Sequence, residues 1–287
     1  MTSRAPEALT LRSRRFEWGL RTYLMGIVNV SPDSFSGDGL ATVQDAVAQA
    51  LRFEAEGADI IDVGGQSTRP ARTAPTTAGF EQLSVEEEID RAVPALRAIL
   101  DAVSLPVSID AYRAPVVEAA LNAGAHLVND IWGFRNDAEV AALAARFNVP
   151  AVVMHNQRGR EPVDVIEGVR AGLLESIRIA EASGLPRERL ILDPGFGFGW
   201  AVEDNLAMLN RLGELRDLGL PLLVGTSRKT TIGAVLEQPE DARVWGTAAT
   251  VAISIANGAD IVRVHDVAEM KQVCVMTDAI VRGRTRG

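Results

Sequence analysis

The sequence predicts an α/β protein with an eight-fold β/α (TIM) barrel built as a single domain. Three observations favour this fold class. Eight short apolar runs alternate with eight segments of helical spacing. The length of 287 residues is ordinary for such a barrel. Residues 29–36, from the end of the first apolar run onward, read NVSPDSFS, whereas an open doubly wound sheet usually has a glycine-rich phosphate loop there.

The predicted strands are short and apolar at almost every position. This pattern is typical of parallel strands that are buried on both faces. In chain order the strands are 23–30, 59–65, 106–110, 126–130, 150–155, 190–195, 221–227 and 261–266.

The predicted helices alternate with these strands. The first has one apolar stripe, made by Val43, Ala46, Val47, Ala50 and Leu51. Glycines at 57, 124 and 184 follow helical segments, where left-handed caps are expected. The helices are 41–56, 84–102, 113–123, 137–146, 164–183, 202–213, 229–256 in two pieces, and 267–282.

The chain divides into an N-terminal extension, 1–20, and the barrel, 21–287, with no linker between further domains. Its start lacks the apolar run of a secretory signal, and Glu7 and Glu17 argue against a transit peptide. A single cysteine, Cys274, can form neither an internal disulfide nor a thiolate metal cage. We therefore expect a cytoplasmic protein.

The net charge of −9 argues against nucleic acid or an anionic membrane surface as a partner. No apolar run is long enough to span a membrane. An anionic ligand would therefore need a local basic cluster. Among 29 basic residues only Lys229 and Lys271 are lysines, so either position 229 requires a compact ammonium or its lysine is chance.

Polar side chains follow nearly every predicted strand. A single Asp in such a place usually caps a helix or forms a turn. In a barrel, however, all eight strand ends converge on the face that carries the active site. The residues are Asn29, Asp62, Gln66, Asp110, Asn129, Asp130, His155, Asp193, Ser227, Arg228, Lys229, Arg263, His265 and Asp266.

These residue types suggest a ligand. A flat heterocycle with amino, ring N–H and carbonyl groups needs mixed donors and acceptors, such as Asp110, Asn129, Asp193 and Lys229. Arg263 and His265 alternate along the last strand and, with Asn29, could hold a phosphate or a metal-bound diphosphate. The alternative for Arg263 is a structural ion pair with Asp62 or Asp266.

Eight local motifs then identify a resemblance to the dihydropteroate synthase family, from about residue 20 to the end. The first two are MGIVNVSPDSFSGDG at 25–39 and GADIIDVGGQSTRP at 57–70. The others follow in family order: SIDAYR at 108–113, NDIWG at 129–133, VVMH at 152–155, LILDPGFGFG at 190–199, GTSRKTTIG at 225–233 and IVRVHDV at 261–267.

The resemblance implies a sulfonamide-target enzyme of folate biosynthesis. It would condense 6-hydroxymethyl-7,8-dihydropterin diphosphate with 4-aminobenzoate and release diphosphate, acting with Mg²⁺ as a cytoplasmic homodimer. It implies a dissociative reaction, in which the bond to diphosphate breaks early and the first two loops close over the arylamine.

The resemblance also implies site residues. The catalytic set is Asp33, Arg69 and Lys229. The pterin set is Asp110, Asn129, Met154, Asp193 and Lys229. The diphosphate set is Asn29, Arg69, Arg263 and His265, with Asn29 as the Mg²⁺ ligand. The 4-aminobenzoate set is Pro32, Phe35, Thr68, Pro70, Phe198 and Thr230.

The chain departs from the family pattern at several places. Gln66 replaces a usual Glu, Trp200 a commoner Lys, and Gly-Asp-Gly at 37–39 a usual Asp-Gly-Gly, while 71–83 lengthens the second loop. One alternative is therefore a pterin-binding paralogue with weak or altered activity. Two others are a corrinoid-linked methyltransferase, which needs no diphosphate site, and a Schiff-base aldolase using Lys229.

Overall fold

The computed structural model describes residues 6–30, 42–66, 83–161 and 164–283. Eight parallel strands form the barrel, in the order β8-β7-β6-β5-β4-β3-β10-β9. A bridge between Leu192 and Leu222 joins the two ends of this order. The strands are β3 (Tyr23–Asn29), β4 (Ile60–Gly64), β5 (Val107–Asp110), β6 (Leu127–Asp130), β7 (Ala151–Met154), β8 (Leu190–Asp193), β9 (Leu223–Val224) and β10 (Ile261–Val264). The predicted eight-fold barrel is confirmed.

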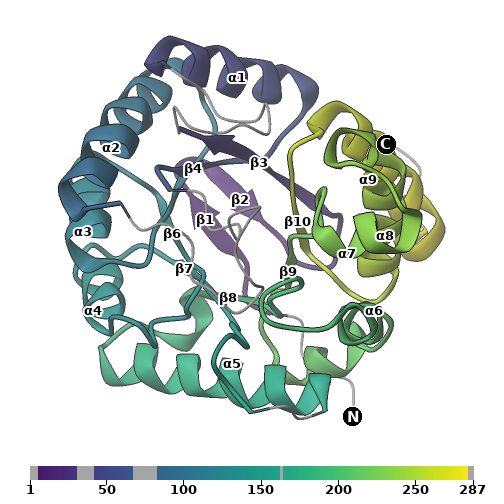
Figure 1. Cartoon of the computed structure of the whole chain (residues 1–287). Coiled ribbons are helices and arrows are strands. Elements are labelled where there is room, and N and C mark those ends of the chain that lie inside the picture. Colours follow the sequence, from purple (N-terminus) through teal and green to yellow (C-terminus); the bar gives the residue numbers. More distant parts are fainter. Residues whose placement is uncertain (1–5, 31–41, 67–82, 162–163, 284–287) are drawn as a thin grey trace.

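The helices form an outer ring around the strands (Figure 1). Two differences from the prediction stand out. The predicted helix 202–213 ends at Asn210, and a 3₁₀ segment, Leu212–Leu218, follows it. Strand β9 is much shorter than the predicted strand 221–227. The helices are α1 (Val43–Glu56), α2 (Val85–Ala102), α3 (Ala114–Asn122), α4 (Glu139–Arg146), α5 (Val165–Ala182), α6 (Val202–Asn210), α7 (Thr230–Leu236), α8 (Val244–Ala256) and α9 (Val267–Arg282).

Local capping explains where several helices begin and end. Ser84 and Glu87 form a reciprocal capping box at the start of α2, with N···O distances of 2.8 and 3.1 Å. Asp164 accepts hydrogen bonds from the first amides of α5. The three predicted glycine caps have φ values of 94°, 105° and 83° at Gly57, Gly124 and Gly184.

A hairpin that the sequence did not predict closes the amino-terminal end of the barrel. Its strands are β1 (Leu9–Leu11) and β2 (Arg14–Phe16), which pair antiparallel. Its apolar side chains share one buried cluster with the first residues of the barrel strands. The rings of Phe16 and Tyr23 lie 4.7 Å apart between centroids, and Trp18 packs edge-on to Tyr23. The predicted boundary at residue 20 stays a prediction.

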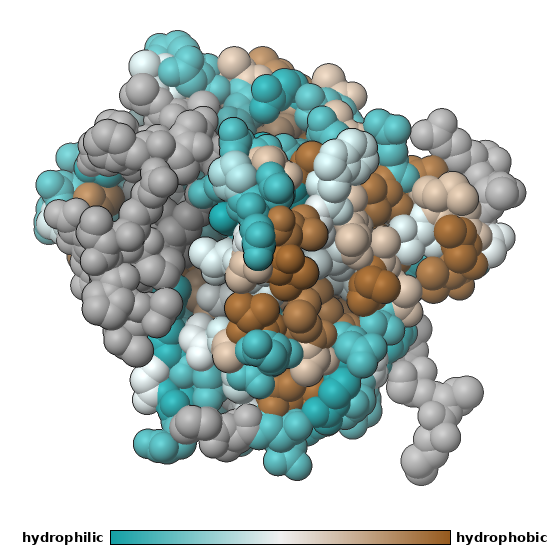
Figure 2. Space-filling model, turned by 45° about the vertical axis from the view of Figure 1, so that its right-hand side comes forward, coloured by the Kyte–Doolittle hydropathy of each residue, from teal (hydrophilic) through white to brown (hydrophobic). Residues whose placement is uncertain are grey.

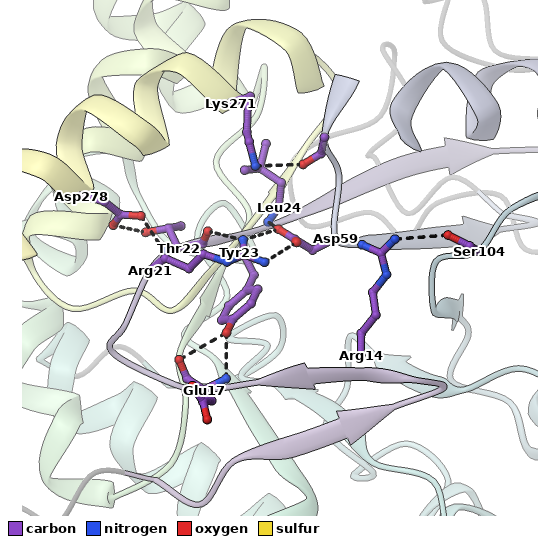
Figure 3. Close-up of polar contacts among 11 residues, drawn as sticks. Arg14, Glu17, Arg21, Thr22, Tyr23, Leu24, Asp59, Ser104, Lys271 and Asp278 are labelled. Carbon is purple, nitrogen blue, oxygen red and sulfur yellow. Dashed lines mark hydrogen bonds and ion pairs between the residues drawn. The ribbon is translucent and has the colours of Figure 1, made fainter. Parts of the chain in front are cut away.

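A polar network joins the start of β3 to its neighbours (Figure 3). Arg21 pairs with Asp59 through N···O distances of 2.9 and 2.6 Å. Thr22 donates from its amide and its hydroxyl to Asp278 of α9, at 2.7 and 2.8 Å. The Tyr23 hydroxyl accepts from the Glu17 amide at 2.7 Å. These contacts tie the hairpin, the barrel and the last helix together at the end opposite the predicted site.

None of the helices in the described part of the chain is long and apolar enough to cross a membrane. Cys274 lies buried in α9, where burial raises the pKa of its thiol to about 12.

Candidate active site

Four predicted strand ends line up across neighbouring strands. Asn29 pairs in register with Gly64, Gly64 with Asp110, and Asp110 with Asn129. Both neighbouring side chains lie close to Gly64, because a Cβ there would be in ordinary van der Waals contact with them, 3.5 Å from the Asp110 Cβ and 3.7 Å from the Asn29 Oδ1. The parallel register therefore brings Asn29, Asp110 and Asn129 to one edge of the barrel mouth.

Arg263 bridges two carboxylates beside this row. Its Nε lies 2.6 Å from Asp62 Oδ2, and its Nη2 lies 2.6 Å from Asp110 Oδ2. Asn129 donates to the same Asp62 oxygen at 2.9 Å. Asp62 is fully buried, and its Oδ1 has no hydrogen-bond partner among the described residues. Of the two ion-pair alternatives for Arg263, the one with Asp62 is found, and Asp110 is a partner that the sequence did not indicate.

The two carboxylates of the predicted pterin set are both desolvated. Burial raises the pKa of Asp110 to about 7; the Arg263 charge opposes that rise, and the Asp62 carboxylate adds to it. Burial also raises the pKa of Asp193, against the opposing effect of the Lys229 ammonium. Perturbed carboxyl groups at a barrel mouth are typical of a functional site.

A glycine-rich turn holds Asp193 and Lys229 together. Asp193 Oδ1 accepts from the Gly195 amide at 2.8 Å. Gly195 has φ 79°, and a Cβ there would lie 1.8 Å from the His155 carbonyl oxygen, so only glycine fits. Lys229 donates from Nζ to the carbonyl oxygen of Phe196, and its Nζ lies 4.5 Å from the centre of the Phe198 ring.

An apolar cluster lies beside these polar groups. Buried Tyr112, Ile131 and Met154 form one cluster, and Trp132 and Phe198 pack against it. A planar ligand can lie against such a surface while its edges meet the carboxylates and amides. The predicted Met154 and Phe198 are thus brought to the site.

The last two loops of the barrel are joined at the mouth. The His265 amide and its Nδ1 lie 3.1 and 2.9 Å from Ser227 Oγ. Asp266, the other suggested partner of Arg263, instead pairs with Arg228. Thr230 is exposed at the first position of α7, next to Lys229.

Two of the polar strand ends have structural roles. Asp130 accepts from the Trp132 and Phe134 amides at 2.7 and 2.8 Å, which is the turn-forming alternative. His155 is fully buried against α5, where a Cβ on Gly172 would lie 1.9 Å from its Nδ1. Burial lowers the pKa of His155 to about 4, so the ring is neutral at physiological pH.

The departures from the family pattern are partly visible. Gln66 is buried, two residues after the end of β4. Trp200 packs against the core, with its ring centroid 5.7 Å from that of His155. The remaining predicted residues and departures lie outside the described residues: Pro32, Asp33, Phe35, Thr68, Arg69, Pro70, the 37–39 segment and most of 71–83.

The described residues contain no group of three or more His, Cys, Asp or Glu side chains placed to hold a metal ion. The Asn29 amide oxygen does lie at the barrel mouth, 3.7 Å from the position that a Cβ on Gly64 would take. Mg²⁺ commonly takes one or two protein oxygens and completes its shell with water and substrate phosphates. The donors present therefore fit a metal that arrives with a diphosphate.

Comparison with known proteins agrees with this geometry. A family model described as "Pterin binding enzyme" matches residues 25–265. A dihydropteroate synthase of Clostridium beijerinckii is 47% identical over 276 residues, covering 96% of this chain and all of the relative. One from Bacillus subtilis is 43% identical and covers 91% of this chain and 89% of the relative.

Solved structures are similar along the same length. A dihydropteroate synthase from Clostridium difficile, solved in the presence of pteroic acid, has a TM-score of 0.86 and 43% identity over 93% of this chain and 99% of that chain. The Yersinia pestis enzyme, solved with a sulfonamide drug, has a TM-score of 0.88 and 35% identity over 97% of this chain and 100% of that chain. The Xanthomonas albilineans enzyme with 7,8-dihydropteroate has a TM-score of 0.83 and 36% identity over 96% and 98%.

Proposed function

The chain belongs to the pterin-binding enzyme family, and from that premise we infer that it is a dihydropteroate synthase. It transfers a pterinylmethyl group from 6-hydroxymethyl-7,8-dihydropterin diphosphate to the amine of 4-aminobenzoate. The observation that carries this function is the barrel mouth itself. There, two desolvated carboxylates, an amide and an ammonium lie around the apolar cluster, which we propose forms a slot for a flat ring, beside a half-buried arginine.

The pterin ring edge would meet Asp193, Asn129 and Asp110. Asp193 would accept from the 2-amino group and a ring N–H, since a carboxylate has acceptors but no donors when it is ionised. Lys229 sits between Asp193 and the Phe198 ring, where its ammonium can donate to a ring carbonyl or nitrogen. Met154 would lie against the ring face.

The diphosphate would lie toward Asn29, Arg263 and His265, with Arg69 from the second loop. Arg263 is fixed by two carboxylates yet keeps part of its side chain exposed at the mouth. Mg²⁺ bound by Asn29 would withdraw charge from the leaving diphosphate. Because charge develops on those oxygens as the bond breaks, fixed positive groups there favour the transition state over the ground state.

The arylamine would enter from the opposite side of the slot. Phe198 and Thr230 lie next to Lys229 at that end, and Pro32, Phe35, Thr68 and Pro70 would complete the pocket. Asp33 would face the reacting carbon. The bond from that carbon to the diphosphate oxygen breaks, the amine nitrogen forms the new bond, and the nitrogen then loses a proton. A neutral arylamine is already nucleophilic, so this chain needs no strong base to activate it.

An exposed apolar surface on the late helices supports a homodimer. We call it the late-helix surface; it consists of Val235, Leu236, Trp245, Ile253, Met276, Ile280 and Val281. Trp245 is 80% exposed and Ile280 71%. In Figure 2 this side of the barrel is turned toward the viewer, and hydrophobic side chains gather on the visible face. An apolar patch of this kind usually marks an interface, and a second copy of the chain is the occupant we propose.

The test is a steady-state assay with both substrates and Mg²⁺. A synthase forms 7,8-dihydropteroate and diphosphate in equal amounts and only when both substrates are present. Pterin binding without turnover would instead favour the paralogue, and borohydride trapping of Lys229 with a carbonyl substrate would favour the aldolase. Sedimentation of the protein and of Trp245→Glu tests the dimer, which the variant should weaken.

A further inference from the structure

Arg228 has an unusual backbone for its residue type. Its φ is 56°, in the left-handed region, where a glycine or an asparagine is favoured and a long side chain is strained. Such strain in a folded chain persists where surrounding contacts hold it, and it clusters at functional sites. The residue lies directly between Ser227 and Lys229.

Contacts of the guanidinium, the amide and the carbonyl oxygen hold Arg228 in this conformation. Its guanidinium forms a two-point ion pair with Asp266, with Nε 3.0 Å from Oδ2 and Nη2 bonded to Oδ1. Its amide donates to Thr247 Oγ1 at 3.1 Å, and its carbonyl oxygen accepts from Arg243 Nη1 at 2.9 Å. Thr247 lies within α8, and Arg243 is the N-cap residue of the same helix.

We propose that Arg228 and Asp266 form a positioning pair that fixes Lys229 and His265 relative to each other for the transfer reaction. This proposal rests on the proposed function, because Lys229 and His265 are site residues of that function. Asp266 follows His265 directly, and Arg228 precedes Lys229 directly. The ion pair therefore links the β9–α7 loop to the β10–α9 loop at the residues adjoining the predicted pterin and diphosphate groups.

A second link runs parallel to the first. Ser227 Oγ meets both the amide and the Nδ1 of His265. A guanidinium paired with a carboxylate through two bonds fixes an angle as well as a distance, which a single hydroxyl contact does not. Loss of the ion pair would remove the two-point link and leave the Ser227 hydroxyl contact with His265 in place. Lys229 and His265 would then sample geometries in which they no longer act on one bound substrate.

The test compares variants that keep either the left-handed backbone conformation at 228 or the shape of the side chain at 266. Arg228→Asn retains a residue that tolerates the left-handed conformation, and Asp266→Asn retains the shape of the carboxylate. Each should lower kcat about 10- to 100-fold, the size of effect that a misplacement near 1 Å produces. The dissociation constant of free 6-hydroxymethylpterin should rise by a smaller factor than kcat falls, because Asp110, Asn129 and Asp193 lie on other strands and keep their contacts while Lys229 loses its fixed position. Arg228→Lys should recover only part of the rate, since an ammonium cannot form the two-point pair.

The double variant separates a pair from two independent residues. Arg228→Asn with Asp266→Asn should be no slower than the slower single variant, since both changes break the same link. Arg170→Asn and Asp217→Asn break an exposed ion pair away from the barrel mouth and should leave kcat unchanged. Full activity in either single variant, or multiplied losses in the double variant, would overturn the proposal. A wild-type protein without turnover would overturn the proposed function instead. Should Arg228→Asn fail to fold, Asp266→Asn and Arg228→Lys still decide.

Discussion

Asp193 is the residue whose replacement most directly tests the pterin contact. Changing Asp193 to Asn turns one acceptor into a donor that faces the donors of the pterin edge. A mispaired buried polar group costs about 1–3 kcal/mol, and more when it is charged. Calorimetry should therefore show pterin affinity reduced at least about tenfold. Asp101→Asn, on the exposed end of α2, is the matched control. An unchanged dissociation constant would remove Asp193 from the pterin site.

Arg263 has two roles that substitution can separate. Arg263→Ala leaves the buried Asp62 carboxylate without its cation, which should lower the free energy of unfolding by about 3–5 kcal/mol. The same variant should lose more affinity for the pterin diphosphate than for free pterin, because only the former carries the paired charge. Denaturant unfolding and calorimetry measure the two effects. Equal losses for both ligands would mean that Arg263 acts only through Asp62 and Asp110.

Asp110 should make stability depend on pH near neutrality. Its pKa in the folded protein is about 7, above the ordinary 3.8. A raised carboxyl pKa contributes stability that is present below the unfolded pKa and is lost as pH rises through the folded value. Relative to Asp110→Asn, the wild type should therefore lose roughly 1–3 kcal/mol between pH 5 and pH 8. Denaturant unfolding at both values checks this, and a constant difference would show that Asp110 is ionised throughout.

The polar residues at strand ends show what sequence reasoning can and cannot supply. Their type and spacing predicted that Asp110, Asn129 and Asp193 would lie at one face, and the register places Asp110 beside Asn129 and Asp193 beside Met154. The same pattern could not separate Asp193 from Asp130, because both follow strands. Only the folded turn shows that Asp130 binds backbone amides. Arg228 and Asp266 were both among the predicted strand-end residues, but a spacing pattern shows neither the left-handed conformation of Arg228 nor its ion pair with Asp266.

At the scale of whole elements, the positions of the barrel strands were predicted to within a residue or two, apart from β9. Continuous apolar runs define such strands well, because both faces are buried. That last run was predicted as 221–227, but only Leu223–Val224 pair as a strand. The remainder turns through Gly225 toward the Ser-Arg-Lys loop, whose conformation depends on contacts with α8 and α9.

The hairpin was missed because each of its strands has only three residues, too few for a visible alternation. Phe16 is nonetheless 1% exposed beneath the barrel. Phe16→Ala should lower the free energy of unfolding by about 3–5 kcal/mol, from lost burial and a new cavity. Thr10→Ala on the exposed side of the same hairpin should change it little. Denaturant unfolding gives both values, and equal small effects would show that the hairpin does not stabilise the barrel.

At the scale of the molecule, the two ends of the barrel have different roles. The amino-terminal end is closed by the hairpin and by ion pairs such as Arg21–Asp59 (Figure 3). The carboxyl-terminal end holds Asp110 and Asp193, whose buried carboxyl groups have raised pKa values, beside an apolar cluster. The amino-terminal end therefore carries structural contacts and the carboxyl-terminal end carries the site, which is the division expected of a β/α barrel enzyme.

The central claim is that the strand ends at this mouth hold the pterin. The most direct measurement is a crystal structure of the protein with 7,8-dihydropteroate. The account predicts the pterin ring against Met154, with its amino edge on Asp193 and a further edge on Asn129, and the aminobenzoate end extending past Lys229 and Phe198. A product bound outside this slot, or a pterin edge that makes no contact with Asp193 and Asn129, would contradict it.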